Sequence, residues 1–385
     1  MRLGINGFFW NRESTGSGQY TRSLVDGLLT LSEGPECVLF RPGRTEPNQN
    51  TLASGRRMQE VCLAPPISLT ENLSKLWFEQ ISFPRACIDQ EVDVAHVPYF
   101  ASPLRTRSKT VVTIHDLIPL ILPAYRGSIP VRLYARLVAA GAKRATAIIT
   151  DSVSSEHDIL DLLNVSPARV HVVYLAVSEM FKPVRDTQRL SMIRQKYHLG
   201  EEYVLYLGGF DQRKNLEILL LAFATLAKHS STEAKLVIAG RLPAQNSAFF
   251  PDPRPVVERL GLRDKVILAG WVPEEDKPAL YSDAALFVFP SLYEGFGLPP
   301  LEAMSCGTPV IVSNCSSLPE IVGEGAVLVD AHDVDGLAGA MAELLEDENR
   351  RKELAAKGLK QAQLFSWQKT VKQTMEVYES VAARR

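Results

Sequence analysis

Two glutamates, Glu294 and Glu302, stand eight residues apart in the most informative stretch of the chain, with two glycines and two prolines between them. Glycines let a ligand approach the backbone, and loop amides that lead into a helix form a site suited to phosphate. A carboxylate beside such a site can accept hydrogen bonds from a vicinal diol. The alternatives are dipole stabilisation for Glu302, predicted in a first helical turn, and a solvated loop position for Glu294. The residues together favour a binding site.

Two adjacent cations, Arg213 and Lys214, follow an apolar run that ends in Gly208 and Gly209. Cations at the carboxyl edge of a parallel sheet can neutralise a diphosphate. The alternative is a solvated charge pair in a loop. Because Glu294 emerges from the same edge of the same predicted sheet, we favour the diphosphate site.

Two features of the first half also stand at strand ends. His115 closes a buried strand and can donate a hydrogen bond to a sugar hydroxyl, although a purely structural histidine is the alternative. Gly16 and Gly18 lie between the first strand and the first helix, but the third glycine of the dinucleotide fingerprint is absent.

Metal chemistry has one weak signal, the pair Asp333 and Asp335, which forms a literal DxD pattern. These residues follow a predicted strand and begin a predicted helix, so Asp333 is expected to cap that helix. The sequence therefore predicts a site that holds no metal.

Short β-branched runs alternate with amphipathic stretches along the whole chain, which indicates parallel strands buried on both faces. The strands are predicted at 3–6, 37–40, 92–96, 110–115, 147–150, 170–174, 203–207, 236–239, 266–268, 285–289, 309–312 and 326–328. The helices are predicted at 19–31, 73–87, 129–142, 154–163, 216–228, 254–260, 277–281, 301–306, 334–343 and 366–381. The fold class is therefore α/β, with two doubly wound parallel sheets in series and residues 179–197 as the connection.

Composition narrows the classes of protein. The 385 residues hold 42 basic and 44 acidic side chains, a net charge of −2, which argues against a nucleic-acid partner. The chain shows no apolar run of about 18 residues and no secretory pattern at its start, and its five cysteines are scattered, so a cytoplasmic protein is expected. Residues 101–150 carry eight Lys or Arg against the single acid Asp116. That stretch, with Tyr125, Ile129 and Tyr134, predicts peripheral contact with an anionic membrane, or else a solvated helix face.

The stretch from Glu294 to Glu302 resembles the E-x7-E signature of the retaining glycosyltransferases of family 4. The Arg213-Lys214-Asn215 window, the strand end at His115 and the loop with Gly16 and Gly18 follow in the family's order, so the resemblance spans the chain. It implies the GT-B fold, two Rossmann-like domains that face a cleft. Residues 1–178 would form the acceptor domain, 179–365 the nucleotide-sugar donor domain, and 366–385 a helix that crosses back onto the first domain.

The same resemblance implies the roles of individual residues. Arg213 and Lys214 would bind the diphosphate leaving group, and Glu294 and His115 would contact the donor sugar; these four form the expected catalytic set. Glu302 would bind the ribose hydroxyls, the base would lie near Val272, and Gly16 and Gly18 would line the cleft from the acceptor side. The expected donor-site residues are Gly16, Gly18, Gly209, Val272, Gly295, Phe296, Gly297, Leu298 and Glu302.

The donor and acceptor follow from a narrower likeness. Residues 115–119, His-Asp-Leu-Ile-Pro, are similar to bacterial mannosyltransferases of O-antigen and exopolysaccharide assembly. The resemblance thus implies GDP-mannose as donor, with a UDP-sugar as the alternative, a glycan or lipid-linked saccharide as acceptor, and no required cofactor. Two alternatives of other classes are a sugar-nucleotide 2-epimerase and a non-catalytic protein that only binds sugar nucleotide.

Overall fold

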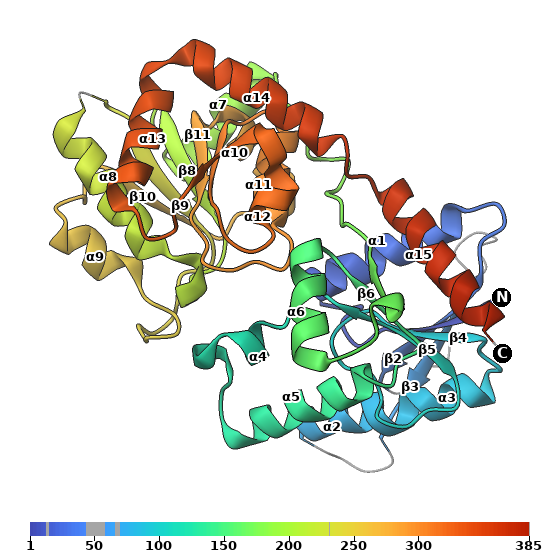
Figure 1. Cartoon of the computed structure of the whole chain (residues 1–385). Helices are drawn as coiled ribbons and strands as arrows, with labels where there is room; N and C mark the ends of the chain where they lie inside the picture. Colours follow the sequence, from blue (N-terminus) through green and yellow to red (C-terminus); the bar gives the residue numbers. More distant parts are fainter. Residues whose placement is uncertain (13–14, 44–57, 66–69, 231, 385) are drawn as a thin grey trace. The chain divides into compact units, whose positions relative to one another are not determined.

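The structure, a computed structural model, describes residues 1–12, 15–43, 58–65, 70–230 and 232–384. The chain divides into two compact units (Figure 1). Unit 1 holds Met1–Tyr174 and Trp367–Arg385, and unit 2 holds Leu175–Ser366. The sequence places the corresponding boundaries after residues 178 and 365.

Unit 1 is built on a seven-stranded sheet with the order β3-β2-β1-β4-β5-β6-β7, in which every neighbouring pair is parallel. Its strands are β1 (Arg2–Asn6), β2 (Glu36–Pro42), β3 (Met58–Leu63), β4 (Val94–Val97), β5 (Lys109–Ile114), β6 (Ala147–Thr150) and β7 (Val170–Val172). Its helices are α1 (Gly16–Thr30), α2 (Glu71–Trp77), η1 (Phe78–Ser82), α3 (Phe83–Asp89), α4 (Ile118–Ile121), η2 (Pro123–Tyr125), α5 (Ile129–Ala142), α6 (Val153–Leu163), η3 (Pro167–Arg169) and α15 (Trp367–Ala383). The sequence predicts all of these strands except β3.

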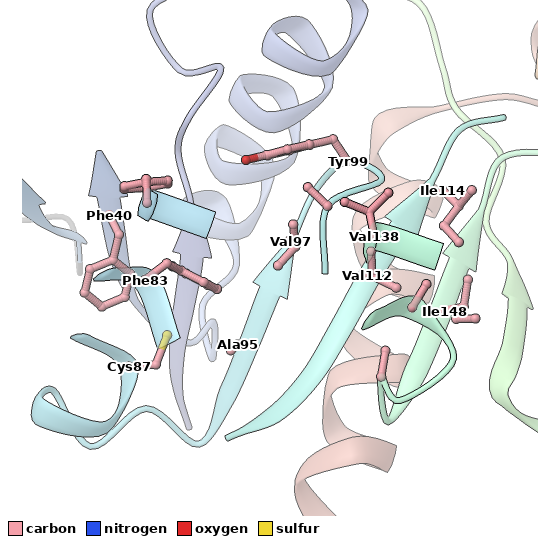
Figure 2. Packing of buried hydrophobic residues seen from close by; sticks show 14 of the residues in the cluster. Phe40, Phe83, Cys87, Ala95, Val97, Tyr99, Val112, Ile114, Val138 and Ile148 are labelled. Atoms are coloured by element: carbon pink, nitrogen blue, oxygen red, sulfur yellow. The ribbon is translucent and has the colours of Figure 1, made fainter. Parts of the chain in front are cut away.

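The core of unit 1 lies between the sheet and its covering helices, as Figure 2 shows for one side. Val97, Val112 and Ile148 from three adjacent strands are fully buried. Phe83 from α3 and Val138 from α5 pack against the same cluster. Every residue of β4 and β6 is buried, as expected for strands covered on both faces.

The last helix of the chain, α15, belongs to unit 1 and packs beside α1 (Figure 1). Tyr378 Oη and His96 Nδ1 lie 2.7 Å apart in the interior, and Thr370 Oγ1 donates to the Tyr174 carbonyl oxygen at 2.7 Å. Gly27 allows this approach, since a Cβ there would lie 2.4 Å from Val371 Cγ2. The C-terminal helix therefore completes the core of the N-terminal unit.

Unit 2 is built on a six-stranded parallel sheet with the order β10-β9-β8-β11-β12-β13. Its strands are β8 (Tyr203–Leu207), β9 (Lys235–Ala239), β10 (Val266–Gly270), β11 (Leu286–Phe289), β12 (Val310–Ser313) and β13 (Ala326–Val329). Its helices are α7 (Thr187–Tyr197), η4 (Gln212–Lys214), α8 (Leu216–His229), α9 (Pro253–Arg259), η5 (Glu274–Asp276), α10 (Lys277–Asp283), α11 (Leu298–Ser305), α12 (Leu318–Val322), η6 (Gly323–Gly325), α13 (Val334–Glu346) and α14 (Glu348–Ala362).

The sequence predicts residues 179–197 as a connection, but residues 187–197 of this segment form the helix α7. Asp186 caps this helix, and Ile193 and Tyr197 are buried. Arg194 forms two hydrogen bonds of 2.6 Å with Asp283 at the end of α10, which fastens α7 to unit 2. The segment is therefore part of the second unit.

Two doubly wound parallel sheets confirm the predicted fold class. Each sheet reverses its strand order once, between β1 and β4 in unit 1 and between β8 and β11 in unit 2. Open α/β sheets bind ligands beyond the carboxyl ends of the strands at such a reversal. No helix among the described residues has the length and apolar character needed to cross a membrane.

Candidate active site

An ion triad in unit 2 joins two segments that are 80 residues apart in the chain. Because β8 and β11 are neighbours, the loops that follow them meet at one edge of the sheet. Glu294 Oε1 accepts a hydrogen bond from Lys214 Nζ at 2.6 Å, and Glu294 Oε2 lies 2.8 Å from Arg213 Nη1. The structure therefore brings together three of the four predicted catalytic residues.

Further contacts fix the geometry of this triad. Ser291 Oγ donates to Glu294 Oε1 at 2.5 Å, and Arg213 Nη1 donates to the Tyr293 carbonyl oxygen at 2.9 Å. Asn215, in the left-handed conformation with φ of 56°, donates to two backbone carbonyl oxygens at 2.7 and 3.1 Å. Asparagine tolerates this conformation better than most residues. These contacts pin both loops in place.

The electrostatics of the triad differ from the sequence-based expectation of two cations awaiting a phosphate. Burial alone would raise the pKa of Glu294, but Lys214 and Arg213 overcome this effect and lower it. Burial lowers the pKa of Lys214, and Glu294 offsets part of that shift. Asp211 adds a second acid, 3.1 Å from Arg213 Nε. Two cations thus face two carboxylates, and the formal charge of this group of four side chains is zero.

Glu302 lies in α11 but not in its first turn, because the helix begins at Leu298, three residues before the predicted start. Tyr281 Oη donates to Glu302 Oε2 at 2.8 Å. Burial raises the pKa of Glu302 to about 7, although Lys277 and the Tyr281 hydrogen bond act in the opposite direction. The contacts of Glu302 therefore offset only part of the free-energy cost of burying its charged form.

The loop between the two glutamates buries both of its glycines and the ring of Phe296. Gly295 and Gly297 are buried, and Gly297 has a φ of 114° that only glycine adopts readily. Phe296 is 5% exposed, and its ring packs edge-on against Phe365 with centroids 5.8 Å apart. Leu298 begins α11.

The ends of β9 and β10 place an aromatic ring and a cation together. Trp271 is half exposed, and the Arg241 guanidinium carbon lies 5.3 Å from the centre of its ring. Val272 next to it is buried, whereas Gly209 is exposed and its carbonyl oxygen accepts a hydrogen bond from Tyr206 Oη at 2.5 Å. Sequence reasoning missed Arg241, although its place next to Gly240, directly after the predicted strand 236–239, was a usable signal.

In unit 1, His115 is held by a partner that the sequence analysis did not identify. His115 Nδ1 donates to Asp151 Oδ2 at 2.6 Å, and Asp151 is 1% exposed. Burial would lower the pKa of His115, but Asp151 overcomes this effect and raises it. Asp151 follows β6 as His115 follows β5, so its position directly after a predicted strand was the available signal.

His96, another histidine close to a strand end, has a structural place. It is fully buried, and Nε2 lies 2.8 Å from Thr113 Oγ1. Burial lowers the pKa of His96 to about 3, so its ring stays neutral. Its two nitrogens are occupied by Thr113 and Tyr378.

Gly16 and Gly18, expected in the loop before the first helix, instead lie in the first turn of α1, which begins three residues earlier than predicted, and the two differ in their surroundings. A Cβ at Gly18 would lie 2.2 Å from the carbonyl oxygen of Arg12, so this glycine is required by the chain's own packing. A Cβ at Gly16 would meet no described atom within 4 Å. Of the two, Gly16 has the open space that a ligand needs.

The predicted cap at Asp333 is confirmed, since this carboxylate accepts a hydrogen bond from the Gly336 amide at 2.8 Å. Across the part of the chain that the structure describes, no three His, Cys, Asp or Glu side chains gather in a group that could hold a metal ion.

Comparison with known proteins identifies the families that these two units match. Residues 14–179 match the model of Glycosyltransferase Family 4, and residues 191–361 match that of Glycosyl transferases group 1. The O-antigen chain mannosyltransferase B of Escherichia coli is 33% identical over 95% of this chain and 96% of its own length. The serotype-specific mannosyltransferase WbdA of the same species is 36% identical over 70% of this chain but only 33% of its own. The sucrose-phosphate synthase of Thermosynechococcus elongatus shares the GT-B fold with a TM-score of 0.77 at 24% identity, covering 99% of this chain and 98% of that one.

Proposed function

This chain belongs to the family 4 glycosyltransferases, and from that premise we propose that it transfers mannose from GDP-mannose to a glycan or a lipid-linked saccharide. The proposal includes retention of the anomeric configuration and independence of metal ions. One observation carries it: a relative that matches almost from end to end is named a mannosyltransferase. Family membership favours a glycosyltransferase over the epimerase and the non-catalytic protein.

For the donor diphosphate we propose Arg213 and Lys214 as the binding cations. Breaking the bond between the sugar and the diphosphate builds negative charge on the leaving oxygen, and fixed cations stabilise that charge most where water is excluded. The observation in support is that both side chains are largely buried, and that the carboxylate of Glu294 already holds their charged groups at one point.

Glu294 would then position the sugar. When the diphosphate binds the two cations, the Glu294 carboxylate needs new donors, and the hydroxyls of the transferred sugar can supply them. We propose the corresponding role for Glu302 with the ribose hydroxyls, and backbone contacts to the donor from residues 295–298. Trp271 and Arg241 offer a flat surface near Val272 on which a nucleobase can stack.

In unit 1 we propose that His115 Nε2, which lies 3.3 Å from the Pro98 carbonyl oxygen, donates a hydrogen bond to a sugar hydroxyl of a substrate in place of that contact. Asp151 accepts from Nδ1 and so fixes the ring orientation. Because Asp151 raises the pKa of His115, the ring holds its second proton at higher pH than an ordinary histidine. Gly16 is the proposed point of close approach to the backbone in this unit.

The donor is tested by a thermal-shift screen of GDP-mannose, UDP-glucose and UDP-N-acetylglucosamine. A ligand that binds the native protein alone raises its melting temperature according to its concentration relative to Kd. We expect the largest shift with GDP-mannose, and transfer in the presence of EDTA with an anomeric proton signal that matches retention. A larger shift with a UDP-sugar would contradict the proposed donor.

The role of Glu294 is tested separately with Glu294→Gln. This substitution removes one negative charge next to two cations, so we expect the variant to bind GDP about tenfold more tightly while it loses transfer. Glu353→Gln, at an exposed carboxylate of α14, is the control that removes a charge elsewhere in unit 2. Unchanged GDP affinity in E294Q would contradict the proposed diphosphate site.

For the membrane we propose peripheral contact through α5. Ile129 and Leu133 expose 67% and 58% of their surface, and the exposed Arg132 and Arg136 lie on the same helix. Tyr134 does not take part, since its hydroxyl donates to the buried Glu79 at 2.8 Å. Sedimentation with anionic vesicles should be sensitive to salt and weaker in the double variant R132Q/R136Q. Equal sedimentation of the variant would end this proposal.

A further inference from the structure

Unit 1 contains a pocket of about 500 Å³ that none of the proposed roles uses. One wall is the segment that leads from β4 into the start of β5, and the other consists of the residues just before β6. Four of the lining side chains are cationic, and none is acidic. The cations are Arg105, Arg107, Lys109 and Arg144.

The pocket and His115 lie at opposite ends of the same strand. Lys109 is the first residue of β5, and His115 directly follows its last. Six residues of extended strand span about 20 Å. The pocket therefore stands at the amino edge of the sheet, whereas His115 and Asp151 stand at the carboxyl edge, so that a small ligand cannot contact both.

The four cations have no carboxylate partner among the described residues. Lys109 Nζ donates to the Ala382 carbonyl oxygen at 2.7 Å, and Arg144 Nη1 donates to the Leu104 carbonyl oxygen at 3.1 Å. Such contacts orient the cations but leave their charge uncompensated. A fifth cation stands beside the wall, because Arg384 Nη1 donates to the Thr146 carbonyl oxygen at 3.0 Å. Arg213 and Lys214 differ in this respect, because both are paired with Glu294.

A buried hydroxyl supplies an independent sign of a missing partner. Ser102 lines the pocket and is 1% exposed, and its Oγ has no hydrogen-bond partner in the described part of the chain. Buried polar groups are nearly always paired in folded proteins.

The loop that carries Ser102 is itself fixed. Gln80 Oε1 accepts from the Leu104 amide at 2.9 Å. Gly141 of α5 approaches so closely that a Cβ there would lie 2.1 Å from the Ser102 carbonyl oxygen. The pocket is thus formed in advance of any ligand, which reduces the cost of binding.

We propose that this pocket binds a phosphate ester or diphosphate that carries at least two negative charges. Arginine forks bind phosphate oxygens in pairs, and a hydroxyl such as that of Ser102 can donate to a further oxygen. A volume of about 500 Å³ is in the range of small-ligand sites and leaves room for the group that the phosphate is attached to. The ligand is either a soluble phosphorylated compound or the headgroup of a phospholipid.

The test must measure binding at the pocket residues themselves, because Arg213 and Lys214 would also bind a diphosphate. Phenylglyoxal modifies accessible arginines, and mass spectrometry measures the modification of each. We expect pyrophosphate to slow modification of Arg105, Arg107 and Arg144 at least about fivefold, since bound phosphate occupies their donor groups. Arg263, whose side chain in unit 2 is 77% exposed and has no proposed role, is the internal control and should react at the same rate throughout.

The double variant R105Q/R107Q, checked for an unchanged melting temperature, should lose the protection of Arg144 and its share of pyrophosphate binding. Phosphatidylcholine vesicles with and without phosphatidic acid form the second arm. Protection by pyrophosphate assigns a soluble ligand, and protection only by phosphatidic acid assigns a lipid headgroup. If Arg144 reacts at the same rate under all conditions, the proposal is overturned, whereas failure of the donor site alone would appear at Arg213.

Discussion

Replacement of Glu302 by glutamine should stabilise the ligand-free protein, and more so as the pH rises. Burial raises the pKa of this carboxyl from 4.5 to about 7. The native state therefore holds the proton more tightly than the unfolded state, and the free energy of unfolding falls as the pH rises from about 4.5 to about 7. Glutamine is neutral at every pH and can still accept the hydrogen bond from Tyr281.

The size of the effect follows from the shift. Each pKa unit corresponds to about 1.4 kcal/mol, so ionisation of Glu302 costs the native state roughly 3 kcal/mol above pH 7. Relative to the wild type, E302Q should gain roughly 2–3 kcal/mol between pH 5 and pH 8. For a unit of this size, that corresponds to roughly 5–10 °C in the melting temperature.

The assay is calorimetric unfolding of both proteins at pH 5 and pH 8 without ligand. Glu353→Gln is the control, because Lys357 lowers the pKa of this exposed carboxyl, so that substitution should bring no gain at high pH. If the melting temperature of E302Q rises by the same amount at both pH values, or falls at pH 8, the reasoning about burial is wrong. The same variant should bind the donor more weakly, since a carboxylate is the better acceptor for ribose hydroxyls.

Three further predictions concern unit 1. Gly18→Ala should cost about 1–3 kcal/mol of stability, because its Cβ would collide with the Arg12 carbonyl oxygen. Gly16→Ala should leave the melting temperature unchanged and reduce kcat/KM. Urea unfolding and initial rates check both variants, and equal stabilities would contradict the packing argument. Tyr378→Phe should cost about 1–3 kcal/mol, because it leaves a buried His96 nitrogen without its partner, and a urea midpoint equal to that of the wild type would refute this. Asp151→Asn should lower the pKa of His115, since burial then acts without the nearby charge. In that variant the stabilising contribution of protonated His115, present at low pH and lost as the pH rises through its folded pKa, should disappear; NMR titration of the His115 ring measures the shift, and an unchanged pKa would refute the assignment.

The buried strands and the strongly amphipathic helices could be predicted from sequence. Strand β8 and helix α5 have the predicted bounds, because continuous apolar runs or a clear apolar face determine them. Strand β3, Met-Gln-Glu-Val-Cys-Leu, lies at the edge of its sheet, and its mixed polarity resembles a loop. Helix α14 buries only Leu354, Gly358 and Ala362, so it shows almost no apolar stripe.

The predicted strand ends indicated where the candidate site lies, but they did not indicate which of its side chains pair with one another. The alternation of strands and helices predicted that Arg213, Lys214 and Glu294 lie at one edge of a sheet, but they meet because β8 and β11, which are not consecutive in the chain, are neighbours. That Glu294 would occupy both cations depends on rotamers and on burial, which no sequence pattern encodes. Asp151 was missed for a related reason, since its pairing with His115 requires that β5 and β6 lie side by side.

The ion triad suggests how one site can be stable when empty and selective when filled. Two buried cations without carboxylates would cost several kcal/mol, and Glu294 and Asp211 remove that cost in the empty protein. On the proposed roles, a diphosphate that takes over Arg213 and Lys214 leaves the Glu294 carboxylate buried without its cations. A free nucleoside diphosphate offers no replacement, whereas a nucleotide sugar brings hydroxyl donors along with its phosphates. The same carboxylate would then stabilise the empty fold and favour the glycosylated donor over its own product, which promotes release of the diphosphate after transfer.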